Sequence, residues 1–530
     1  YGEAKVLRAM YYLELVRNWG DVPYRRKPAG NKDELFIGAT DRDIILTDMI
    51  NDLIEVEPVM WYAEESDRGV EAASREFCQG LIARMALYRG GWTLRPDYSN
   101  PAAIGSMQRN DDWQKYYEIA EKYAGKVINE GKHSLNRSFR QVWVDECSWI
   151  VPVNDDNIFD VPAKVGGSGE LGYSWGTYIV SQKNSEGQNA SNAPHGYSSG
   201  GSKLALTYML SFDNKDLRRD LTCEMFRYEN SGMTNIVQKP IAALTVYCGK
   251  WNRLFMATPL GSTSNKGTGI NYTYMRYADV LLMYAEAANE NHNGPTPQAK
   301  EALKKVRNRA FAAEDQPEMV DAYVDRLTSK EDFFDAIVKE RAWEFGGEKH
   351  RRYDLARWNL YGKTLYNLYF DWITLGKVAR TKQYENTTTA FEEPTYDERF
   401  ESYPAVAYYK MVDAVNPAAV CVSQTIDWYK EGGKNSYDEA FESYPLKAPT
   451  GYTLINMCNQ YCTQVKNTSN PRQWVPAPAV LFSFYGYINE SNAATVNPET
   501  DPVRYLVPIP PDALSSHQGC LLYTSDAADD

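Results

Sequence analysis

The stretch YTYMRYADVLLMYAEAANENHNGPTPQAKEALKKVRNRA, residues Tyr272–Ala310, decides the fold of this 530-residue chain. From Tyr272 onward it carries two apolar stripes at helical spacing, which predicts a helix that is buried on most of its faces. The pattern breaks at Gly294, and a second helix is expected at once, because Thr296 can cap it and Pro297 suits its first turn. The connection is so short that we expect the two helices to pack antiparallel.

Helical patterns continue on both sides of this hairpin. Upstream, apolar side chains recur at helical spacing over Glu3–Trp19, Asp41–Val56, Glu71–Tyr88 and Trp113–Asn129. Downstream, Thr328–Glu331 has the spacing of a capping box and opens a further helix, and Arg352–Tyr361 continues helically. Serial helix pairs with short turns predict a stack of helical repeats, although no strict 34-residue consensus is visible. The expected fold class is therefore all-α, a superhelix of helix pairs.

Two long stretches, about 154–202 and 376–480, lose the helical period and are expected to be irregular insertions. The first is rich in Gly, Ser and Asn, yet it contains aromatic residues for which a flexible linker has no use. The second repeats Tyr396–Pro404 as Tyr437–Pro445, for which we favour a duplicated loop over two equivalent contacts. We expect one domain over residues 1–514. Residues 515–530 have no apolar period and are expected to be non-native or disordered.

Composition excludes several classes of protein. Lys+Arg is 57 and Asp+Glu is 70, a net charge of −13 that argues against a general nucleic-acid binder. No uninterrupted apolar run is long enough to span a bilayer. The 8 Cys and 5 His are scattered, and HExxH, Gly-x-Ser-x-Gly and phosphate-loop motifs are absent from the sequence, so we expect no metal, no cofactor and no catalytic residues.

Aromatic composition is the unusual feature. Tyr (39) outnumbers Phe (17) more than twofold, and Trp adds 13. Tyr and Trp combine an apolar ring with a polar group and suit half-wet binding surfaces better than Phe does. The excess favours a recognition protein, although for any single Tyr helix packing is the more ordinary role.

Four stretches in order resemble one family. AKVLRAMYYLELVRNWGDVPY (Ala4–Tyr24) is similar to the first helix and turn of SusD/RagB-type proteins, and Met275–Glu290 with Ala302–Ala310 is similar to their central hairpin. AIVKERAWEFGGEKHRRYDLARW (Ala336–Trp358) resembles their signature helix-turn-helix, and YLVPIPPDAL (Tyr505–Leu514) resembles their closing segment. The resemblance spans nearly the whole chain.

The resemblance implies a function, a partner and a location. Proteins of this family are noncatalytic glycan-binding lipoproteins on the outer surface of Bacteroidetes-type bacteria, with tetratricopeptide-like helix pairs. It implies a lipid anchor on the extracellular face of the outer membrane and a SusC-like TonB-dependent transporter for which the protein captures substrate. The family's signal peptide, lipidated Cys and first helices are not in this sequence, which opens at Tyr1. We therefore expect an N-terminally truncated chain whose membrane attachment lies outside it.

Sugar rings stack on aromatic side chains, and amide, Arg and carboxylate groups then form hydrogen bonds with the sugar hydroxyls. The first irregular stretch has this composition, and its aromatic residues are our candidate ligand-binding residues: Tyr173, Trp175, Tyr178 and Tyr197. Gln182, Asn184, Gln188, Asn189 and Asn192 are interleaved with them. The alternative is a surface loop whose aromatic residues only pin it to the helices. Trp428 and Tyr429 form a second candidate platform.

The signature helix offers acidic side chains for which an enzyme is the rival interpretation. Glu340 and Glu344 lie one turn apart, and Glu348 and His350 follow, which permits a glycosidase carboxylate pair or a Glu/His metal site. Interleaved Arg and Lys favour an ion-pair network that braces packed helices. The leading prediction is noncatalytic oligosaccharide or polysaccharide binding and delivery to a transporter. An all-helical glycoside hydrolase and a helical-repeat scaffold that binds protein remain alternatives.

Overall fold

The structure is a computed structural model. It describes residues 1–30, 36–97, 99–100, 103–180, 196–231, 235–240, 246–261, 266–371, 406–410, 452–456, 462–465, 473–476, 486–489 and 491–508.

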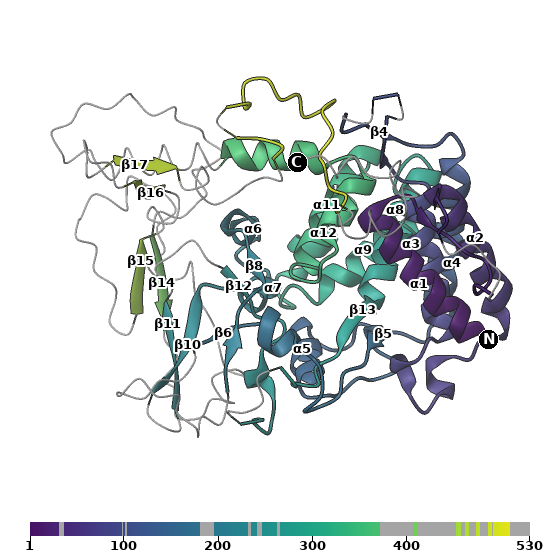
Figure 1. The fold of residues 1–530 in the computed structure, drawn as a ribbon. Coiled ribbons are helices and arrows are strands. Elements are labelled where there is room, and N and C mark those ends of the chain that lie inside the picture. Colours follow the sequence, from purple (N-terminus) through teal and green to yellow (C-terminus); the bar gives the residue numbers. More distant parts are fainter. Residues whose placement is uncertain are drawn as a thin grey trace.

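Paired helices form the body of the molecule. α1 (Gly2–Trp19) packs on α2 (Arg42–Val56), α3 (Arg75–Arg89) on α4 (Trp113–Glu130), and α8 (Tyr277–Asn291) on α9 (Pro297–Asn308). Further contacts of α2 with α3 and of α4 with α8 stack the pairs, and α11 (Lys330–Glu344) packs on α8. Figure 1 shows this stack, which contains the N-terminus. The predicted stack of helix pairs is confirmed.

Shorter helical segments connect the pairs and lie beside them. These are η1 (Glu57–Val59), η2 (Ala63–Glu65), η3 (Gly69–Glu71), α5 (Phe139–Cys147), η4 (Leu171–Trp175), α6 (Leu206–Leu210), α7 (Leu217–Thr222), η5 (Arg253–Phe255), η6 (Pro317–Ala322), α10 (Tyr323–Asp325) and α12 (Arg351–Arg357).

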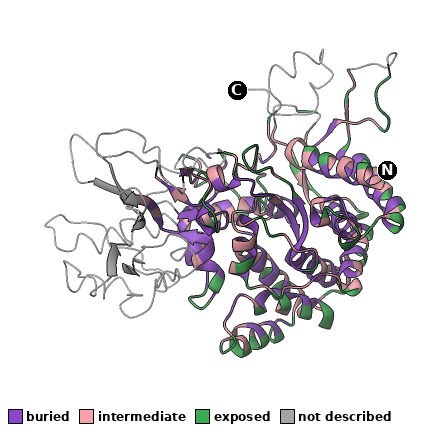
Figure 2. Ribbon diagram, turned by 90° about the horizontal axis from the view of Figure 1, so that it is seen from below, coloured by how far each residue is buried: buried purple, intermediate pink, exposed green. Residues whose placement is uncertain are grey.

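The core follows the apolar stripes of the sequence. In α8 nearly every side chain is buried, including Ala278, Leu281 and Ala285 at 0% exposure, as expected for a helix that is apolar on most faces. Figure 2 shows buried residues facing inward on the paired helices and exposed residues on their outer faces. The central hairpin is therefore the packing centre of the stack.

Helix caps agree with the sequence at the hairpin and differ elsewhere. Thr296 accepts a hydrogen bond from the Ala299 N–H at 3.1 Å, which confirms it as the N-cap of α9. The cap of α11 is Ser329, not Thr328, and it accepts from the Asp332 N–H at 3.0 Å. α3 begins four residues later than Glu71, because Ser74 caps it.

Residues Tyr272–Arg276 form a strand, β13, and not the start of a helix as predicted. β13 pairs antiparallel with β5 (Asn157–Val161), and α8 begins only at Tyr277. Aromatic and β-branched residues such as Thr273 and Tyr274 favour a strand once a partner is available, and that partner comes from more than 100 positions upstream. Local periodicity cannot reveal it.

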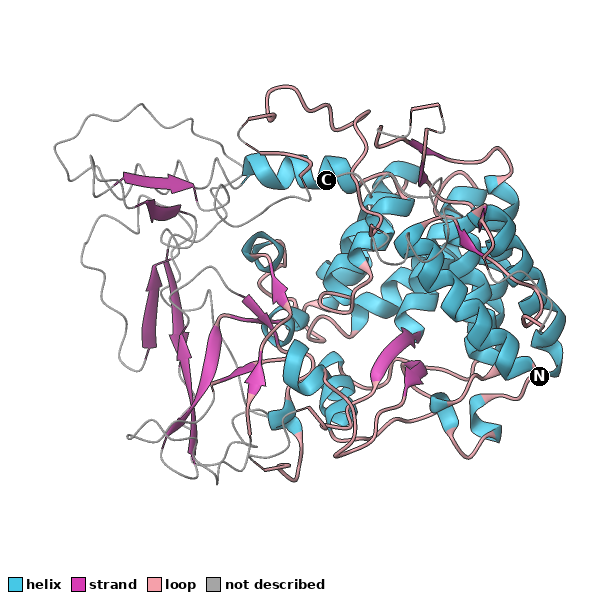
Figure 3. Ribbon diagram, in the orientation of Figure 1, coloured by secondary structure: helices cyan, strands magenta, loops and turns pink. Residues whose placement is uncertain are grey.

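Several small sheets accompany the helices, and most of their strands lie on one side of the stack (Figure 3). β6 (Tyr178–Ile179) and β7 (Ser198–Ser199) join β10 (Phe226–Ser231) and β11 (Asn235–Pro240) in the order β11-β10-β6-β7. β8 (Lys203–Leu204), β12 (Val246–Cys248) and β9 (Cys223–Glu224) form the order β8-β12-β9. The remaining pairs are β1 (Val22–Pro23) with β2 (Ala39–Thr40), β3 (Thr93–Arg95) with β4 (Ser106–Gln108), β14 (Val406–Lys410) with β15 (Tyr452–Asn456), and β16 (Cys462–Val465) with β17 (Gln473–Pro476).

These strands qualify the prediction of irregular insertions. The stretch 154–202 holds β5, η4, β6 and β7, and the stretch 376–480 holds β14 to β17. The two copies of the repeat, Tyr396–Pro404 and Tyr437–Pro445, lie outside the described residues.

The end of the described chain, the extended segment 501–508, lies against α1 and β3. The Val507 N–H donates to the Asn18 carbonyl oxygen at 2.7 Å, and the Tyr505 hydroxyl accepts from the Leu94 N–H at 2.9 Å. This confirms an extended packing segment, since the prolines of this stretch exclude a helix. Among the residues described, no helix is both long and apolar enough to span a bilayer.

Candidate functional site

The four aromatic residues singled out above lie on two short stretches that pack together, 171–180 and 196–201. Tyr173 and Trp175 belong to η4, Tyr178 to β6, and Tyr197 directly precedes β7. β6 and β7 pair antiparallel, with Tyr178 opposite Ser199. The hydroxyls of Ser198 and Ser199 donate to the Tyr173 carbonyl oxygen at 2.9 and 3.1 Å, so η4 is fixed to the strand pair. We refer to residues 171–180 and 196–201 as the aromatic segment.

Three tyrosines of the aromatic segment come together. The rings of Tyr173 and Tyr197 meet edge to face with centroids 5.4 Å apart. Tyr178 lies 5.2 Å from the ring of Tyr247, a residue of β12 that the sequence analysis missed. Burial and the nearby phenols of Tyr173 and Tyr178 raise the pKa of Tyr197. All three side chains are half-buried, so their rings are held by neighbours while part of each surface stays open to solvent.

Trp175 has a different neighbour. The Lys349 ammonium nitrogen lies 3.6 Å from the centre of the Trp175 ring, which is cation–π contact distance. Lys349 also lies 5.6 Å from the Tyr272 ring. It belongs to the turn after the signature helix, where its φ is +67°. A sugar that stacks on this face of Trp175 must therefore displace the Lys349 side chain or use the other face.

Two glycines let the aromatic segment pack closely. A Cβ at Gly176 would lie 1.7 Å from the Trp251 carbonyl oxygen, so any side chain here would collide with backbone. Gly200 has φ +58°, and a Cβ there would lie 2.8 Å from both the Tyr178 Cβ and the Tyr247 ring. The glycine-rich composition of the stretch thus serves tight packing around the tyrosines.

Charged groups surround the tyrosines. The Arg253 guanidinium donates to the Tyr197 carbonyl oxygen at 2.7 Å, and burial lowers the pKa of Arg253 to about 10. Lys266 lies 5.9 Å from the Tyr173 ring and pairs with Glu170 at 3.0 Å. Aromatic rings flanked by such groups can stack on a sugar and bind its hydroxyls. Tyr247 and Lys349 carry no local sequence signal, because only tertiary folding brings them here.

Other candidate residues lie outside the part of the chain that the structure describes. These are the interleaved amides Gln182, Asn184, Gln188, Asn189 and Asn192, and the second platform, Trp428 and Tyr429.

The acidic residues of the signature helix are held in ion pairs. Glu340 binds Arg218 and Arg307, each at 2.6 Å. Glu344 lies 2.6 Å from Arg309 and 2.8 Å from Arg276, and these cations hold the pKa of Glu344 well below its usual range. The predicted bracing role is confirmed for these carboxylates.

Glu348 and His350 are the other two candidate residues of the signature stretch, and both are held away from a catalytic or metal-binding arrangement. Glu348 accepts from the buried Lys250 ammonium at 2.5 Å and from Arg276 at 2.9 Å. Burial lowers the pKa of His350 to about 4, so the ring is neutral at pH 7. Among the described residues, no group of three His, Cys, Asp or Glu side chains has a metal-binding arrangement.

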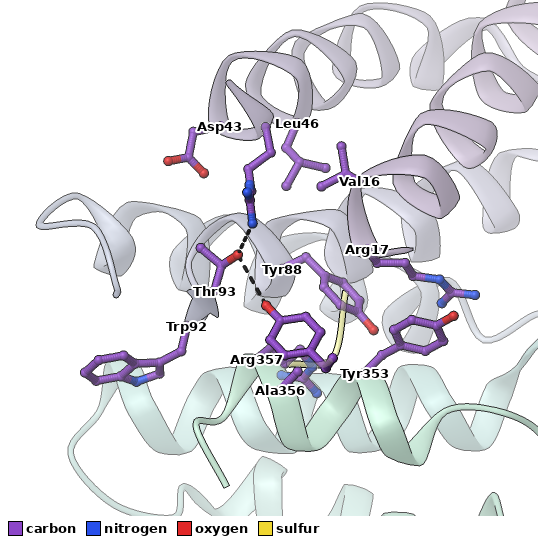
Figure 4. Close-up of a pocket in the computed structure, with 12 residues that line it drawn as sticks. Val16, Arg17, Asp43, Leu46, Tyr88, Trp92, Thr93, Tyr353, Ala356 and Arg357 are labelled. Atoms are coloured by element: carbon purple, nitrogen blue, oxygen red, sulfur yellow. Dashed lines mark hydrogen bonds between the residues drawn. The ribbon is translucent and has the colours of Figure 1, made fainter. Parts of the chain in front are cut away.

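A cavity near α1 is too small for a sugar. It lies between Arg17, Tyr88, Thr93 and Tyr353, and its volume is about 30 Å³, enough for a water molecule or two. Figure 4 shows Thr93 in the middle of this pocket and the Arg17 guanidinium near the Tyr353 ring. That guanidinium lies 4.0 Å from the centre of the ring. Because Thr93 also receives a hydrogen bond from Arg42 at 2.8 Å, the pocket is part of the packing between α1, α2 and the chain end.

Comparison with known proteins gives three findings. The model of the SusD family, SusD_RagB, matches residues 173–520, more than half of the chain. SusD-like protein P25 from Formosa agariphila is 28% identical over 385 residues, which cover 68% of this chain and 63% of that protein. A crystal structure of a SusD homolog from Bacteroides thetaiotaomicron superposes with a TM-score of 0.58 at 23% identity, with 68% of each chain covered. The chain thus spans less than two thirds of the curated relative, and the solved structure shows the same fold.

Proposed function

Because this chain belongs to the SusD family, we propose that it binds an oligosaccharide or polysaccharide at the cell surface without cleaving it and delivers it to a SusC-like TonB-dependent transporter. The binding step rests on Tyr173, Tyr178 and Tyr197, three half-buried tyrosines that lie near one another although the stretch 181–195 separates Tyr197 from the other two in sequence. That convergence is the observation that carries the proposal.

Aromatic rings in this arrangement suit sugar recognition. Each good aromatic contact contributes about 1 kcal/mol, so several rings together are needed for useful affinity. Lys349, Lys266 and Arg253 add hydrogen-bond donors within reach of the rings. A noncatalytic role agrees with the state of Glu340 and Glu344, whose charges are used in buried ion pairs and are not poised across an open groove.

Binding is tested on a glycan array, followed by affinity electrophoresis in the polysaccharides that score. The double variant Tyr173→Ala/Tyr197→Ala is expected to weaken binding by 10-fold or more, since two contacts of about 1 kcal/mol each are lost. Tyr11→Ala is the matched control, because Tyr11 is a 61% exposed tyrosine on α1, away from the aromatic segment. Equal affinity of the double variant and the control would remove the aromatic segment from the site.

Trp175 is tested separately. Trp175→Ala is compared with Trp61→Ala, a change at a tryptophan that is 71% exposed. Because Lys349 covers one face of Trp175, Lys349→Ala is added: if Trp175 stacks on sugar, Lys349→Ala keeps or strengthens binding and Trp175→Ala weakens it. Weakening by Lys349→Ala alone would assign the contact to the ammonium and not to the ring.

Delivery and location need separate experiments. Co-purification of the full-length protein with a SusC-like transporter from the native membrane tests the partner, and protease shaving of intact cells tests surface exposure. The rival glycoside hydrolase predicts new reducing ends from soluble glycan that disappear in a single carboxylate variant. The rival protein-binding scaffold predicts competition by peptides and none by sugars.

A further inference from the structure

Two cysteines face each other in the small sheet β8-β12-β9. Cys223 on β9 and Cys248 on β12 are direct partners in the antiparallel register, and both side chains are 0% exposed. The sheet lies beside α7 (Figure 1). Tyr247, the residue before Cys248, contacts the Tyr178 ring of the aromatic segment. The fold therefore brings two cysteines that are scattered in the sequence together, next to the candidate glycan site.

Neither backbone N–H of the pair is directed at the opposite cysteine. The Cys248 N–H donates to the Ser202 carbonyl oxygen at 3.3 Å, on the side of β12 that pairs with β8. The Cys223 N–H donates to the Arg219 carbonyl oxygen in α7. The two cysteines are therefore a non-hydrogen-bonded pair, the kind in which directly opposite side chains approach most closely.

A pair of this kind has the backbone spacing of a disulfide. The hydrogen bond between the strands comes one residue further along, from the Gly249 N–H to the Thr222 carbonyl oxygen at 3.1 Å. The Cα atoms of a non-hydrogen-bonded pair are about 4.5 Å apart, and disulfides span Cα separations of about 4.4–6.8 Å. A bond between the two sulfur atoms can therefore form without rearranging the strands.

The two thiols lie on the same side of the sheet, because directly opposite residues of antiparallel strands share a face. Burial and the nearby thiols of Cys223 and Cys248 raise the pKa of Tyr208, so both sulfur atoms lie close to this one phenol. The Cys248 Sγ also packs on Gly347, where φ is +83° and a Cβ would collide with the sulfur. The pair thus lies in a buried layer between the sheet and the turn after the signature helix.

We propose that Cys223 and Cys248 form a disulfide in the exported protein. The proposal rests on the proposed function in one respect, namely that the chain reaches the cell surface through an oxidising compartment. The bond closes a loop that contains β10 and β11. It ties β12, which carries Tyr247, to the end of α7 and so holds one wall of the aromatic segment in place.

The oxidant is itself a disulfide, that of a thiol–disulfide oxidoreductase in the cell or of oxidised glutathione in the test tube. One Cys thiolate attacks this disulfide and forms a mixed disulfide, and the second Cys thiolate then displaces the reduced carrier. Two protons and two electrons leave the cysteine pair, and the carrier disulfide becomes two thiols. Burial raises the pKa of both Cys223 and Cys248 in the folded chain, so we expect the exchange to take place during folding, before the strands are covered.

Peptide mapping of the full-length protein, purified from cells that export it, tests the bond. Free thiols are blocked with N-ethylmaleimide in denaturant, and the protein is digested without reduction and analysed by mass spectrometry. In most molecules we expect a linked peptide that joins Cys223 to Cys248 and separates on reduction. N-ethylmaleimide on both cysteines, or a link from either of them to another cysteine, would overturn the proposal.

Cys78 and Cys147 are the controls in the same digest. They are also 0% exposed, but their Sγ atoms lie against backbone carbonyl oxygens, that of Leu53 at 3.6 Å and that of Lys250 at 3.7 Å. Both are expected to carry N-ethylmaleimide. A digest in which Cys78 and Cys147 are oxidised as often as the proposed pair would show unspecific oxidation and would contradict the proposal.

Thermal unfolding measures what the bond does for stability. Dithiothreitol is expected to lower the midpoint of the wild-type protein by about 2–4 °C, because reduction frees the unfolded chain from the closed loop. Cys223→Ala/Cys248→Ala is expected to show no such response, whereas Cys78→Ala/Cys147→Ala should respond like the wild type. An equal response in Cys223→Ala/Cys248→Ala would mean that another bond is reduced and would overturn the proposal.

The disulfide and the proposed function can fail independently. A linked peptide in a protein that binds nothing on the glycan array supports the disulfide and not the glycan site. Glycan binding by an exported protein in which both Cys223 and Cys248 carry N-ethylmaleimide supports the proposed function and overturns the disulfide.

Discussion

At the scale of single residues, Asp160 combines burial with a strong pKa shift. Its side chain is fully buried in β5, and burial raises its pKa to about 7. Asn157 donates to Asp160 at 2.9 Å and to Glu146 at 3.0 Å, and burial raises the pKa of Glu146 as well. Two buried acids that share one amide donor favour the protonated form, because neither forms an ion pair within the part of the chain that the structure describes.

We predict that Asp160→Asn stabilises the protein at neutral and higher pH. The folded pKa lies above the unfolded one, so the favourable contribution of Asp160 is complete below about pH 4 and is lost as pH rises through 7. At pH 8 the variant should gain up to about 4 kcal/mol in the free energy of unfolding, and little at pH 4. Urea unfolding at both pH values measures this, with the exposed Asp111→Asn as control. An equal effect at both pH values would contradict it.

Glu344 is the opposite case, a buried acid with a lowered pKa. It touches Arg218, Arg276 and Arg309, so Glu344→Gln leaves three buried cations undercompensated. We predict a loss of about 3–5 kcal/mol in the free energy of unfolding. Glu331→Gln, an exposed residue on the same helix, should cost less than about 1 kcal/mol. If Glu344→Gln folds with normal stability, the bracing role is wrong.

The sequence alone predicted that the acidic side chains of the signature helix form ion pairs, but it did not identify the residues they pair with. Alternating Glu and Arg at helical spacing predict ion pairs, yet Arg218 and Arg276, which bind Glu344, lie on α7 and β13. The same limit applies to the candidate site: the tyrosines were visible in the sequence, while Tyr247 and Lys349 were not. Such partners depend on long-range folding, which no local pattern encodes.

At the scale of elements, hydrophobic periodicity predicted a helix correctly where the helix buries an apolar stripe of its own sequence. α1, α2 and α4 agree with the predicted ranges within one residue at each end, because their apolar stripes are local. β13 was wrongly predicted as helix. A strand of a two-stranded sheet is stabilised by hydrogen bonds to its partner, here β5, which is far away in sequence. The short strands of the aromatic segment were missed for the same reason.

Gly176 tests whether the aromatic segment is held in one conformation. In Gly176→Ala the new methyl group collides with the Trp251 backbone, so η4 must move and carry Tyr173 and Trp175 with it. We predict weaker glycan binding and a loss of about 2 kcal/mol or more in stability, typical of severe steric strain. Gly167→Ala is the control on the same stretch, because its Cβ would have only ordinary contacts, the nearest at 3.6 Å. Binding unchanged in Gly176→Ala would show that sugar recognition does not need this geometry.

At the scale of the whole molecule, hydrogen bonds join the two ends of the described chain. Arg352 donates to the Tyr505 carbonyl oxygen, and Val507 pairs with Asn18 of α1. The extended segment thereby connects α1 to α12, two helices far apart in sequence. The resemblance of the segment to a family motif has a physical basis: it closes the stack of helix pairs.

Tyr505→Phe tests this closure. The Tyr505 ring is 7% exposed, and its hydroxyl is the acceptor for the Leu94 N–H at 2.9 Å. Removing the hydroxyl leaves a buried donor without its acceptor, so we predict a loss of about 1–3 kcal/mol in the free energy of unfolding. Tyr11→Phe, at an exposed tyrosine of α1, is the control and should be neutral. Because the segment joins distant helices, the loss should appear as a lower midpoint of one cooperative thermal transition; an early separate transition of the chain end would mean that the segment packs on the stack without closing it.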